Sequence, residues 1–259
     1  MAAGRGSKGA RRPSSSARKP AKGAQGQRRG AKTPPPKKNT TAGNSPAKTT
    51  KTTAVPVPPA PPAGPFRLGA VPGTTPGKWI DIWQERMPQV PLTLVPLTVA
   101  DQRGALDAGV VDAALVRLPI DRDGLHLIPL YDEVPVVVCA ADSHLTAADE
   151  VTADDLAGEV VIAPRDDVLG LELPGTAAPR FAAPDTTEEA IATVAAGVGV
   201  VVVPMSLARL HHRRDVDYRP LAGGPLSSIA LAWPTADPSD LVDVFVGIVR
   251  GRTANSSRS

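Results

Sequence analysis

The stretch LDAGVVDAALVRLP, residues 106–119, decides the fold class of this chain. Gly109 can end a short helix that begins at Asp101, because glycine readily adopts the left-handed conformation that closes a helix. The apolar residues that follow, in the segment 112–119, predict a buried strand. A short helix that leads directly into a buried strand is typical of α/β proteins with a parallel sheet.

The same alternation extends toward the N-terminus. The apolar runs FRLGAV (66–71) and LTLVPL (92–97) predict two further strands, separated by a helix with apolar residues at helical spacing. Thr75 is expected to cap this helix, with Pro76 at its first position. The order strand, helix, strand, helix, strand predicts a parallel sheet with right-handed crossovers.

In the second half of the chain the pattern changes. The apolar runs 125–130 and 134–140 follow each other without an intervening helix, which predicts a change to a second sheet or lobe. The further elements expected are strands at 160–164, 199–204 and 227–233, a helix beginning at Thr186 or Thr187, and a last helix over 240–250 capped by Ser239.

Charge divides the chain into two regions. Residues 1–65 hold fourteen of the 29 Lys and Arg residues and none of the 26 Asp and Glu residues, a net charge of +14. The other 194 residues hold 15 basic and 26 acidic side chains, a net charge of −11. The formal charge of +3 for the whole chain is therefore the sum of two regions of opposite sign, which suit partners of opposite charge.

The basic segment 1–65 has no aromatic residue and many Lys, Ala, Gly and Pro residues. It has too little apolar surface to offset chain entropy, so we expect a disordered tail that ends in a semi-rigid proline-rich linker. Residues 251–259 are expected to form a flexible C-terminal tail. The sequence shows no signal peptide and no apolar run long enough for a membrane span, and its single cysteine, Cys139, cannot form an internal disulfide. These features favour a cytoplasmic protein without a membrane partner, with association with the nucleoid as a further option.

Six short phrases between residues 66 and 250 follow one another in the order and spacing of a known family. They are RLGAV (67–71), IWQERMPQVPL (82–92), LDAGVVDAAL (106–115), GL leading to PLYDE (124–133), DSHL (142–145) and VAAGVGV leading to Pro204 (194–204). Together they resemble the effector-binding domain of LysR-type transcriptional regulators, which shares a two-lobed fold with type 2 periplasmic binding proteins. The third phrase is the most specific match, whereas DSHL lacks the proline of the family.

The resemblance implies an α/β fold, a two-lobed periplasmic-binding-protein-like domain with mixed sheets over residues 66–250, preceded by the disordered basic tail. It places lobe I at about 66–138 and 218–250, and lobe II at about 139–217. The family normally begins with a winged helix-turn-helix and a long linker helix. The proline-rich segment 1–65 cannot form such helices, so reading of promoters by that module is not expected.

A small anionic metabolite is the ligand that the resemblance implies, bound between the lobes. In this fold, helix N-termini and strand ends face the cleft, and both suit carboxylates. The family places anion-contacting hydroxyls at the turn after the first strand, and the remaining candidates lie at comparable turns. The candidate ligand-binding residues are Thr74, Thr75, Thr98, Arg117, Arg165 and Thr186.

Each of these residues also has a purely structural interpretation. Thr75 is first of all a helix cap, and Arg117 and Arg165 can be surface ion-pair partners of the many aspartates. The pair Asp166 and Asp167 fits a solvated turn. The tryptophans of the first helix fit core or dimer packing better than a recognition platform.

Sequence motifs of common enzymes are missing. The chain has no HExxH, GxSxG or P-loop, no GxGxxG followed by an acidic partner, and no Cys/His cluster for a metal. We therefore expect no enzyme, no metal and no cofactor. The alternatives left open are an exported solute-binding protein, an enzyme on a periplasmic-binding-protein-like fold, and a dimerisation scaffold that no longer binds a ligand.

The basic tail predicts contact with DNA or RNA that depends on charge and hardly on base sequence. The residues expected to carry this contact are Arg11, Arg12, Arg18, Lys19, Arg28, Arg29, Lys37 and Lys38. A solubilising extension, or a segment that contacts the acidic domain of its own chain, is the alternative. The resemblance also implies a homodimer, in which the helix at 76–87 packs against the second lobe of the partner.

Overall fold

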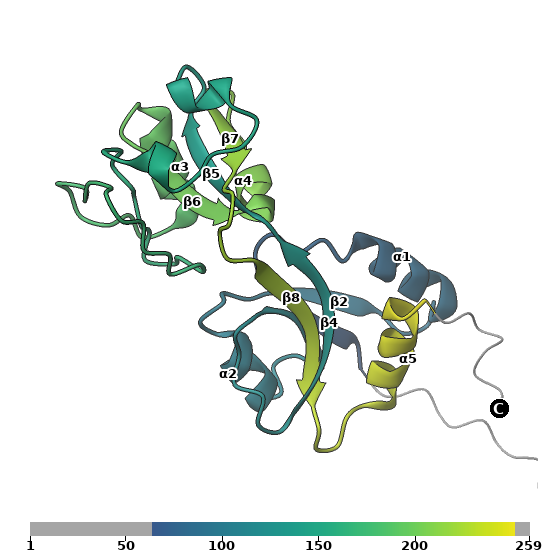
Figure 1. Ribbon diagram of the computed structural model, residues 1–259. Helices are drawn as coiled ribbons and strands as arrows, with labels where there is room; N and C mark the ends of the chain where they lie inside the picture. The colour runs from purple at the N-terminus through teal and green to yellow at the C-terminus, as the bar shows by residue number, and fades with distance from the viewer. Residues whose placement is uncertain (1–63, 252–259) are drawn as a thin grey trace, which may run out of the picture. The chain divides into compact units, whose positions relative to one another are not determined.

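A computed structural model describes residues 64–251, which fold around two β-sheets (Figure 1). The first lobe is built on a five-stranded sheet of order β2-β1-β3-β8-β4. Its strands are β1 (Phe66–Ala70), β2 (Leu92–Pro96), β3 (Ala113–Arg117), β4 (Leu125–Glu133) and β8 (Ser227–Pro234). β1 runs parallel to β2 and β3, whereas β8 is antiparallel to β3 and β4, so the sheet is mixed. The predicted parallel sheet is thus confirmed for β1 to β3.

Helices cover both faces of the first sheet. Helices α1 (Gly77–Arg86) and α5 (Asp240–Val249) pack together on one face, and α2 (Gln102–Asp107) lies on the other (Figure 1). Under α1 and α5, the ring of Phe66 stacks on that of Trp83 with centroids 4.7 Å apart, and the ring of Phe245 lies 5.2 Å from Phe66. Trp83 is fully buried and its indole N–H donates to the carbonyl of Val90 at 2.8 Å. This tryptophan therefore belongs to the core.

The second lobe is built on a three-stranded antiparallel sheet of order β6-β5-β7. Its elements are β5 (Pro135–Ala140), two 3-10 turns at His144–Ala147 and Asp154–Leu156, α3 (Thr187–Ala195), β6 (Val201–Pro204), α4 (Met205–Leu210) and β7 (Val216–Pro220). Alternate residues of β5 contribute to two separate cores, because successive side chains of a strand point to opposite faces. Val136 and Val138 pack with α3 and α4, and Val137 and Cys139 pack on the other side.

The chain passes between the two sheets at two places. The first passage is at Val134, between β4 and β5, earlier than the lobe boundary expected at about residue 138. The second lies between Pro220, the last residue of β7, and Ser227, the first residue of β8. A short linker at Val134 explains why the sequence shows no helix between the two apolar runs.

The helix caps show where the local sequence was sufficient to predict the start of a helix. The side chains of Thr186 and Ser239 accept hydrogen bonds from Glu189 and Leu241 N–H groups, which confirms both as N-caps. The prediction that Thr75 caps α1 is wrong. The carbonyl of Pro76 accepts the first helical bonds, so Pro76 itself takes the N-cap position and no side chain caps the helix.

Two other elements differ from the sequence-based expectation. The strand expected at 160–164 is reduced to single bridges of Val160 with Ala177 and of Val161 with Val200. β7 was not expected, because VDYRP alternates apolar and charged residues over only five positions. The predictions for the basic tail, and for residues 252–259, lie outside the described residues.

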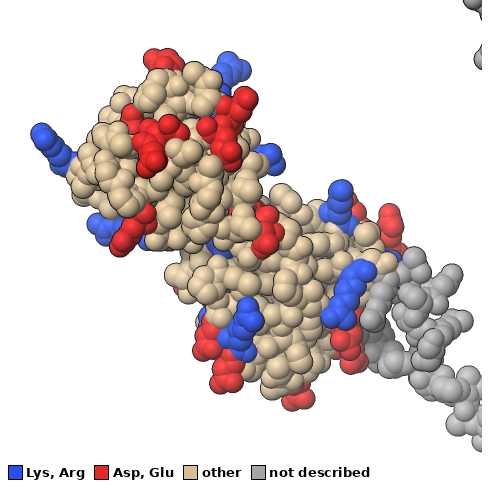
Figure 2. Space-filling model, viewed as in Figure 1, with Lys and Arg blue, Asp and Glu red and all other residues tan. Residues whose placement is uncertain are grey.

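Charged side chains of both signs are interspersed on the face shown in Figure 2. On the described residues in this view there is no broad patch of one sign. The domain carries the acidic share of the chain, since residues beyond 65 hold 26 Asp and Glu against 15 Lys and Arg. Attraction to a polyanion is therefore concentrated in the N-terminal segment.

A buried ion pair of the first lobe lies next to the passages to the second lobe. Arg117, at the end of β3, is 1% exposed, and its Nη1 donates to Oε2 of Glu133 at 2.8 Å. Glu133 is the last residue of β4 and is 9% exposed. The same guanidinium donates to Ser227 at the start of β8, and the hydroxyl of Ser206, in α4, donates to Glu133 at 2.9 Å. The pair therefore lies where both passages between the sheets begin or end.

Removing one member of this ion pair is expected to lower the stability of the folded protein. Glu133→Ala leaves the guanidinium of Arg117 buried without its carboxylate and should lower the free energy of unfolding by about 3–5 kcal/mol. The double variant Arg117→Met/Glu133→Leu replaces both charges by apolar side chains and should recover most of that loss. Urea denaturation of the full-length variants, followed by circular dichroism, measures both changes.

The matched control is the exposed ion pair between Arg103 and Asp107, whose atoms lie 2.9 Å apart. Asp107→Ala should change stability by about 0.5 kcal/mol or less, because solvent screens an exposed pair. Equal losses for Glu133→Ala and Asp107→Ala would show that burial adds nothing to the first pair.

Candidate ligand-binding site

The six predicted ligand-binding residues line two different cavities. Thr98, Arg117, Arg165 and Thr186 line a cavity of about 740 Å³, here called the Arg117 cavity. Thr74 and Thr75 line a second one of about 570 Å³, the Thr75 cavity. The structure thus brings four of the six residues together and separates the other two from them.

The loop after β1 explains this separation. Pro72 lines the Arg117 cavity, whereas Gly73 and the two threonines after it line the other cavity. Gly73 has a φ of 86°, and a Cβ at this position would collide with the side chain of Ser206 in α4. Glycine therefore lets the loop lie directly against α4, and the two cavities open on either side of this contact.

Both lobes contribute to the Arg117 cavity. From the first lobe come Thr98, just after β2, and Arg117, at the end of β3. From the second lobe come Arg165 in a loop, Thr186 at the start of α3, and Leu207 in α4. The remaining lining residues are Pro72, Val99, Ala100, Asp166, Asp167, Val168, Asp185, Thr187, Glu188, Leu210 and His211. Apolar side chains and a few polar groups together are typical of sites for small organic molecules.

The guanidinium of Arg117 is only partly satisfied by hydrogen bonds. Its Nη1 and Nη2 atoms bond to Glu133, to Ser227 and, at 3.3 Å, to the carbonyl of Pro72. Within residues 64–251, its Nε is the one buried side-chain nitrogen or oxygen that lacks a hydrogen-bond partner. A buried donor without an acceptor costs about 1–3 kcal/mol, so this nitrogen makes the buried guanidinium less favourable.

The other expected anion-binding groups are largely engaged within the protein. Arg165 pairs with Asp185 at 3.2 Å, and both side chains are well exposed. Thr98 donates its hydroxyl proton to Asp101 at 2.6 Å. At the N-terminus of α3, the hydroxyl of Thr186 accepts from the N–H of Glu189. The first turn of α3 also carries Glu188 and Glu189, whose negative charges offset the partial positive charge at this end of the helix.

Several other residues of this site could not be singled out from local sequence patterns. Glu188 is recognisable in the sequence only as a residue of a helical first turn, and Asp166 only as part of a solvated turn. Asp166 is in fact held at α3, because the buried hydroxyl of Thr187 donates to its Oδ1 at 2.9 Å. Glu133 and Ser227 lie 16 and 110 residues from Arg117, so local patterns cannot reveal them as its partners.

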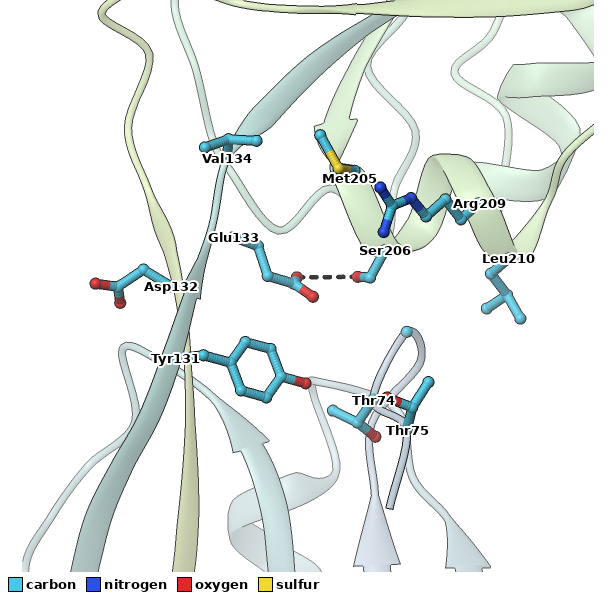
Figure 3. A pocket seen from close by; sticks show the side chains of 11 residues that line it. Thr74, Thr75, Tyr131, Asp132, Glu133, Val134, Met205, Ser206, Arg209 and Leu210 are labelled. Atoms are coloured by element: carbon cyan, nitrogen blue, oxygen red, sulfur yellow. Dashed lines mark hydrogen bonds between the residues drawn. The ribbon is translucent and has the colours of Figure 1, made fainter. Parts of the chain in front are cut away.

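Figure 3 shows the Thr75 cavity. The hydroxyl of Tyr131, from β4, points toward Thr74 and Thr75, and Arg209, from α4, points toward Ser206 (Figure 3). The hydroxyl of Thr74 donates to the carbonyl of Val71 at 2.7 Å, so its proton is already used. Burial and the nearby carboxylate of Glu133 raise the pKa of Tyr131, which keeps the phenol protonated. This cavity is smaller and holds no buried donor that lacks an acceptor.

Cys139 lies buried on β5. Burial, as the largest cause, raises the pKa of its thiol, so the reactive thiolate is disfavoured. The described part of the chain contains no group of three or more His, Cys, Asp or Glu side chains placed to hold a metal ion. Among its helices, none has the length and apolar character needed to cross a bilayer.

Solved structures show the same fold. A full-length OxyR variant from Pseudomonas aeruginosa is 24% identical with a TM-score of 0.57, over 73% of this chain and 70% of that one. The reduced OxyR regulatory domain from the same organism is 26% identical with a TM-score of 0.56, over 73% and 98%. The BenM effector-binding domain, solved with its effector benzoate, is 22% identical with a TM-score of 0.59, over 73% and 91%. No curated protein sequence matches the chain.

The family comparison covers most of the chain. The LysR substrate binding domain matches residues 59–254, which includes every described residue. The match agrees with the two-lobed mixed α/β fold and with the six sequence phrases. The chain therefore belongs to the family of the LysR substrate binding domain.

Proposed function

We propose that this protein is an effector-sensing regulator that binds a small metabolite with a carboxylate or another anionic group in the Arg117 cavity. The observation that carries the proposal is a cavity lined from both lobes, with Arg117 at the end of β3 among its lining residues. A carboxylate oxygen would accept a charge-assisted hydrogen bond from a guanidinium group in such a cavity. The benzoate in the BenM domain is a carboxylate as well, which supports this class of ligand.

A regulatory rather than a catalytic role is the simpler interpretation of the site. The similar structures are a regulatory domain and an effector-binding domain, and two polar groups of the Arg117 cavity are engaged within the protein, Arg117 with Glu133 and Thr186 with Glu189. We propose a protein without catalytic residues or cofactor, located in the cytoplasm.

Ligand binding in this cavity is testable with paired variants. Ala100→Trp places a large ring on the cavity wall, and Arg117→Lys keeps the charge but removes the planar guanidinium. Arg117→Lys should weaken binding of a carboxylate such as benzoate by at least about tenfold, since a hydrogen bond to a charged group contributes roughly 1.5–3 kcal/mol. Ala100→Trp should also weaken it, because the ring occupies space that the ligand needs. A ligand at about one hundred times its dissociation constant should stabilise the wild type by about 2.7 kcal/mol, which a thermal shift measures.

Thr75→Ala is the matched control, because it changes only the lining of the other cavity. It should leave binding unchanged. If Thr75→Ala removes binding while Ala100→Trp does not, the effector occupies the Thr75 cavity and the assignment is wrong.

We also propose that the basic N-terminal segment contacts nucleic acid without base specificity. Its charge of +14 would displace condensed counterions from phosphates. Full-length protein should bind duplexes of unrelated sequence equally, with an affinity that falls steeply between low and physiological salt. A chain that starts at Phe66 should bind them weakly or not at all. Fluorescence anisotropy measures both, and equal binding by the two chains contradicts the proposal.

A homodimer is the proposed assembly, since two-fold pairing is the commonest arrangement of identical chains. The surface proposed is the exposed side of α1, because Trp83 on its inner side is committed to the core. Light scattering of the full-length protein at high micromolar concentration should give the mass of two chains. The mass of one chain at that concentration contradicts it.

A further inference from the structure

We propose that the Thr75 cavity is a second ligand site, for an uncharged molecule that combines an apolar ring with a carboxamide group. The proposal does not depend on the anionic effector of the Arg117 cavity, because the two cavities lie on either side of the contact between Gly73 and Ser206. Both lobes line the Thr75 cavity, and so does Val134, at the passage from β4 to β5.

Exposed apolar side chains gather at this cavity. Eight large apolar side chains of residues 64–251 are exposed, and three of them, Tyr131, Val134 and Leu210, line the cavity. Leu210 also lines the Arg117 cavity, and the half-buried Met205 lines only this one. Exposed apolar surface that is concentrated at a hollow of about 570 Å³ is typical of a binding site for a small organic molecule.

One carboxylate oxygen at the cavity has no hydrogen-bond donor. Glu133 is 9% exposed, and both Arg117 and Ser206 donate to its Oε2. Its Oε1 accepts no hydrogen bond within residues 64–251, yet it keeps some accessible surface. The carboxylate points into the space between Tyr131 and Ser206 (Figure 3). A largely buried oxygen of this kind is stabilised when a ligand N–H donates to it.

Hydroxyl donors lie at the same cavity. Those of Tyr131 and Thr75 make no hydrogen bond within residues 64–251. The pKa of Tyr131 is raised, mainly by burial, so its phenol keeps its proton and can donate. Its hydroxyl is directed toward Thr74 and Thr75 (Figure 3). The cavity therefore offers donors to a ligand as well as an acceptor.

The charges at the cavity favour an uncharged ligand. Arg117 already compensates the charge of Glu133, with Nη1 at 2.8 Å from Oε2. Asp132 points away from the cavity and accepts from Ser228 (Figure 3). A carboxylate ligand would place its oxygens against Oε1 of Glu133, where neither group has a proton to donate. An ammonium ligand would share the cavity with the positive charge of Arg209.

A carboxamide matches both kinds of protein group. Its N–H would donate to Oε1 of Glu133, and its carbonyl would accept from the hydroxyl of Tyr131 or of Thr75. A ring attached to the amide would pack against Val134 and Met205. The same molecule thus uses the polar and the apolar parts of the lining.

Benzamide tests the proposal by isothermal titration calorimetry on the full-length protein. Tyr131→Phe keeps the ring and removes the hydroxyl, so it should weaken benzamide by about three- to tenfold, the effect of losing one uncharged hydrogen bond. Val134→Trp fills the cavity and should abolish binding. Benzylamine, which carries an ammonium group on a similar ring, should bind at least about threefold more weakly than benzamide to the unmodified protein.

Two variants are matched controls. Ala100→Trp introduces the same large ring into the Arg117 cavity, and Tyr218→Phe removes a phenolic hydroxyl from a residue that does not line the Thr75 cavity. Both should leave the affinity for benzamide unchanged. If circular dichroism shows that Val134→Trp does not fold, Tyr131→Phe and the two controls decide the test.

Three results would overturn the second site. They are failure of benzamide to bind, loss of its binding in Ala100→Trp, and an affinity that Tyr131→Phe leaves unchanged. Benzylamine that binds as tightly as benzamide overturns the uncharged class of ligand. The anionic effector of the Arg117 cavity stands or falls separately, with benzoate and Arg117→Lys.

Discussion

The buried pair of Arg117 and Glu133 is the interaction on which the arrangement of this domain depends. Two ionised side chains are taken out of water, which is tolerated only where further hydrogen bonds satisfy them. Here those bonds come from Ser227 at the start of β8 and from Ser206 in α4. One small group of atoms therefore fixes the ends of three strands and the first turn of a helix. Within residues 64–251, Nε of Arg117 is the one buried side-chain nitrogen or oxygen left without a partner.

Much of the first lobe was predictable from the sequence because its information is local. Gly109 follows the end of α2 and β3 begins at Ala113, while β1 and β2 lie within the apolar runs 66–71 and 92–97. The caps at Thr186 and Ser239 were predictable for the same reason. β7 was not, because a short strand with alternating charge is defined by its neighbour β5 rather than by its own residues. The start of α1 was misjudged by one residue, since the carbonyl of Pro76 replaces the side chain of Thr75.

The candidate site was predictable in kind but not in detail. Turns after parallel strands were expected to converge, and Thr98 and Arg117 do line one cavity. The sequence could not show that the loop at Gly73 divides the space, because that depends on contact with α4, far along the chain. The sequence also could not show which charged side chains are already paired within the protein. Arg165 and Thr186 line the cavity, but Arg165 pairs with Asp185 and the hydroxyl of Thr186 accepts a hydrogen bond from Glu189.

The position of Cys139 makes the protein convenient for spectroscopy. It is the only cysteine in the sequence, and on β5 it is buried with a thiol that resists ionisation. Maleimide dyes and spin labels react with thiolates, so a cysteine introduced on the surface should be labelled far faster than the native one. One label on each lobe would then report the distance between them in solution, with the natural cysteine left in place.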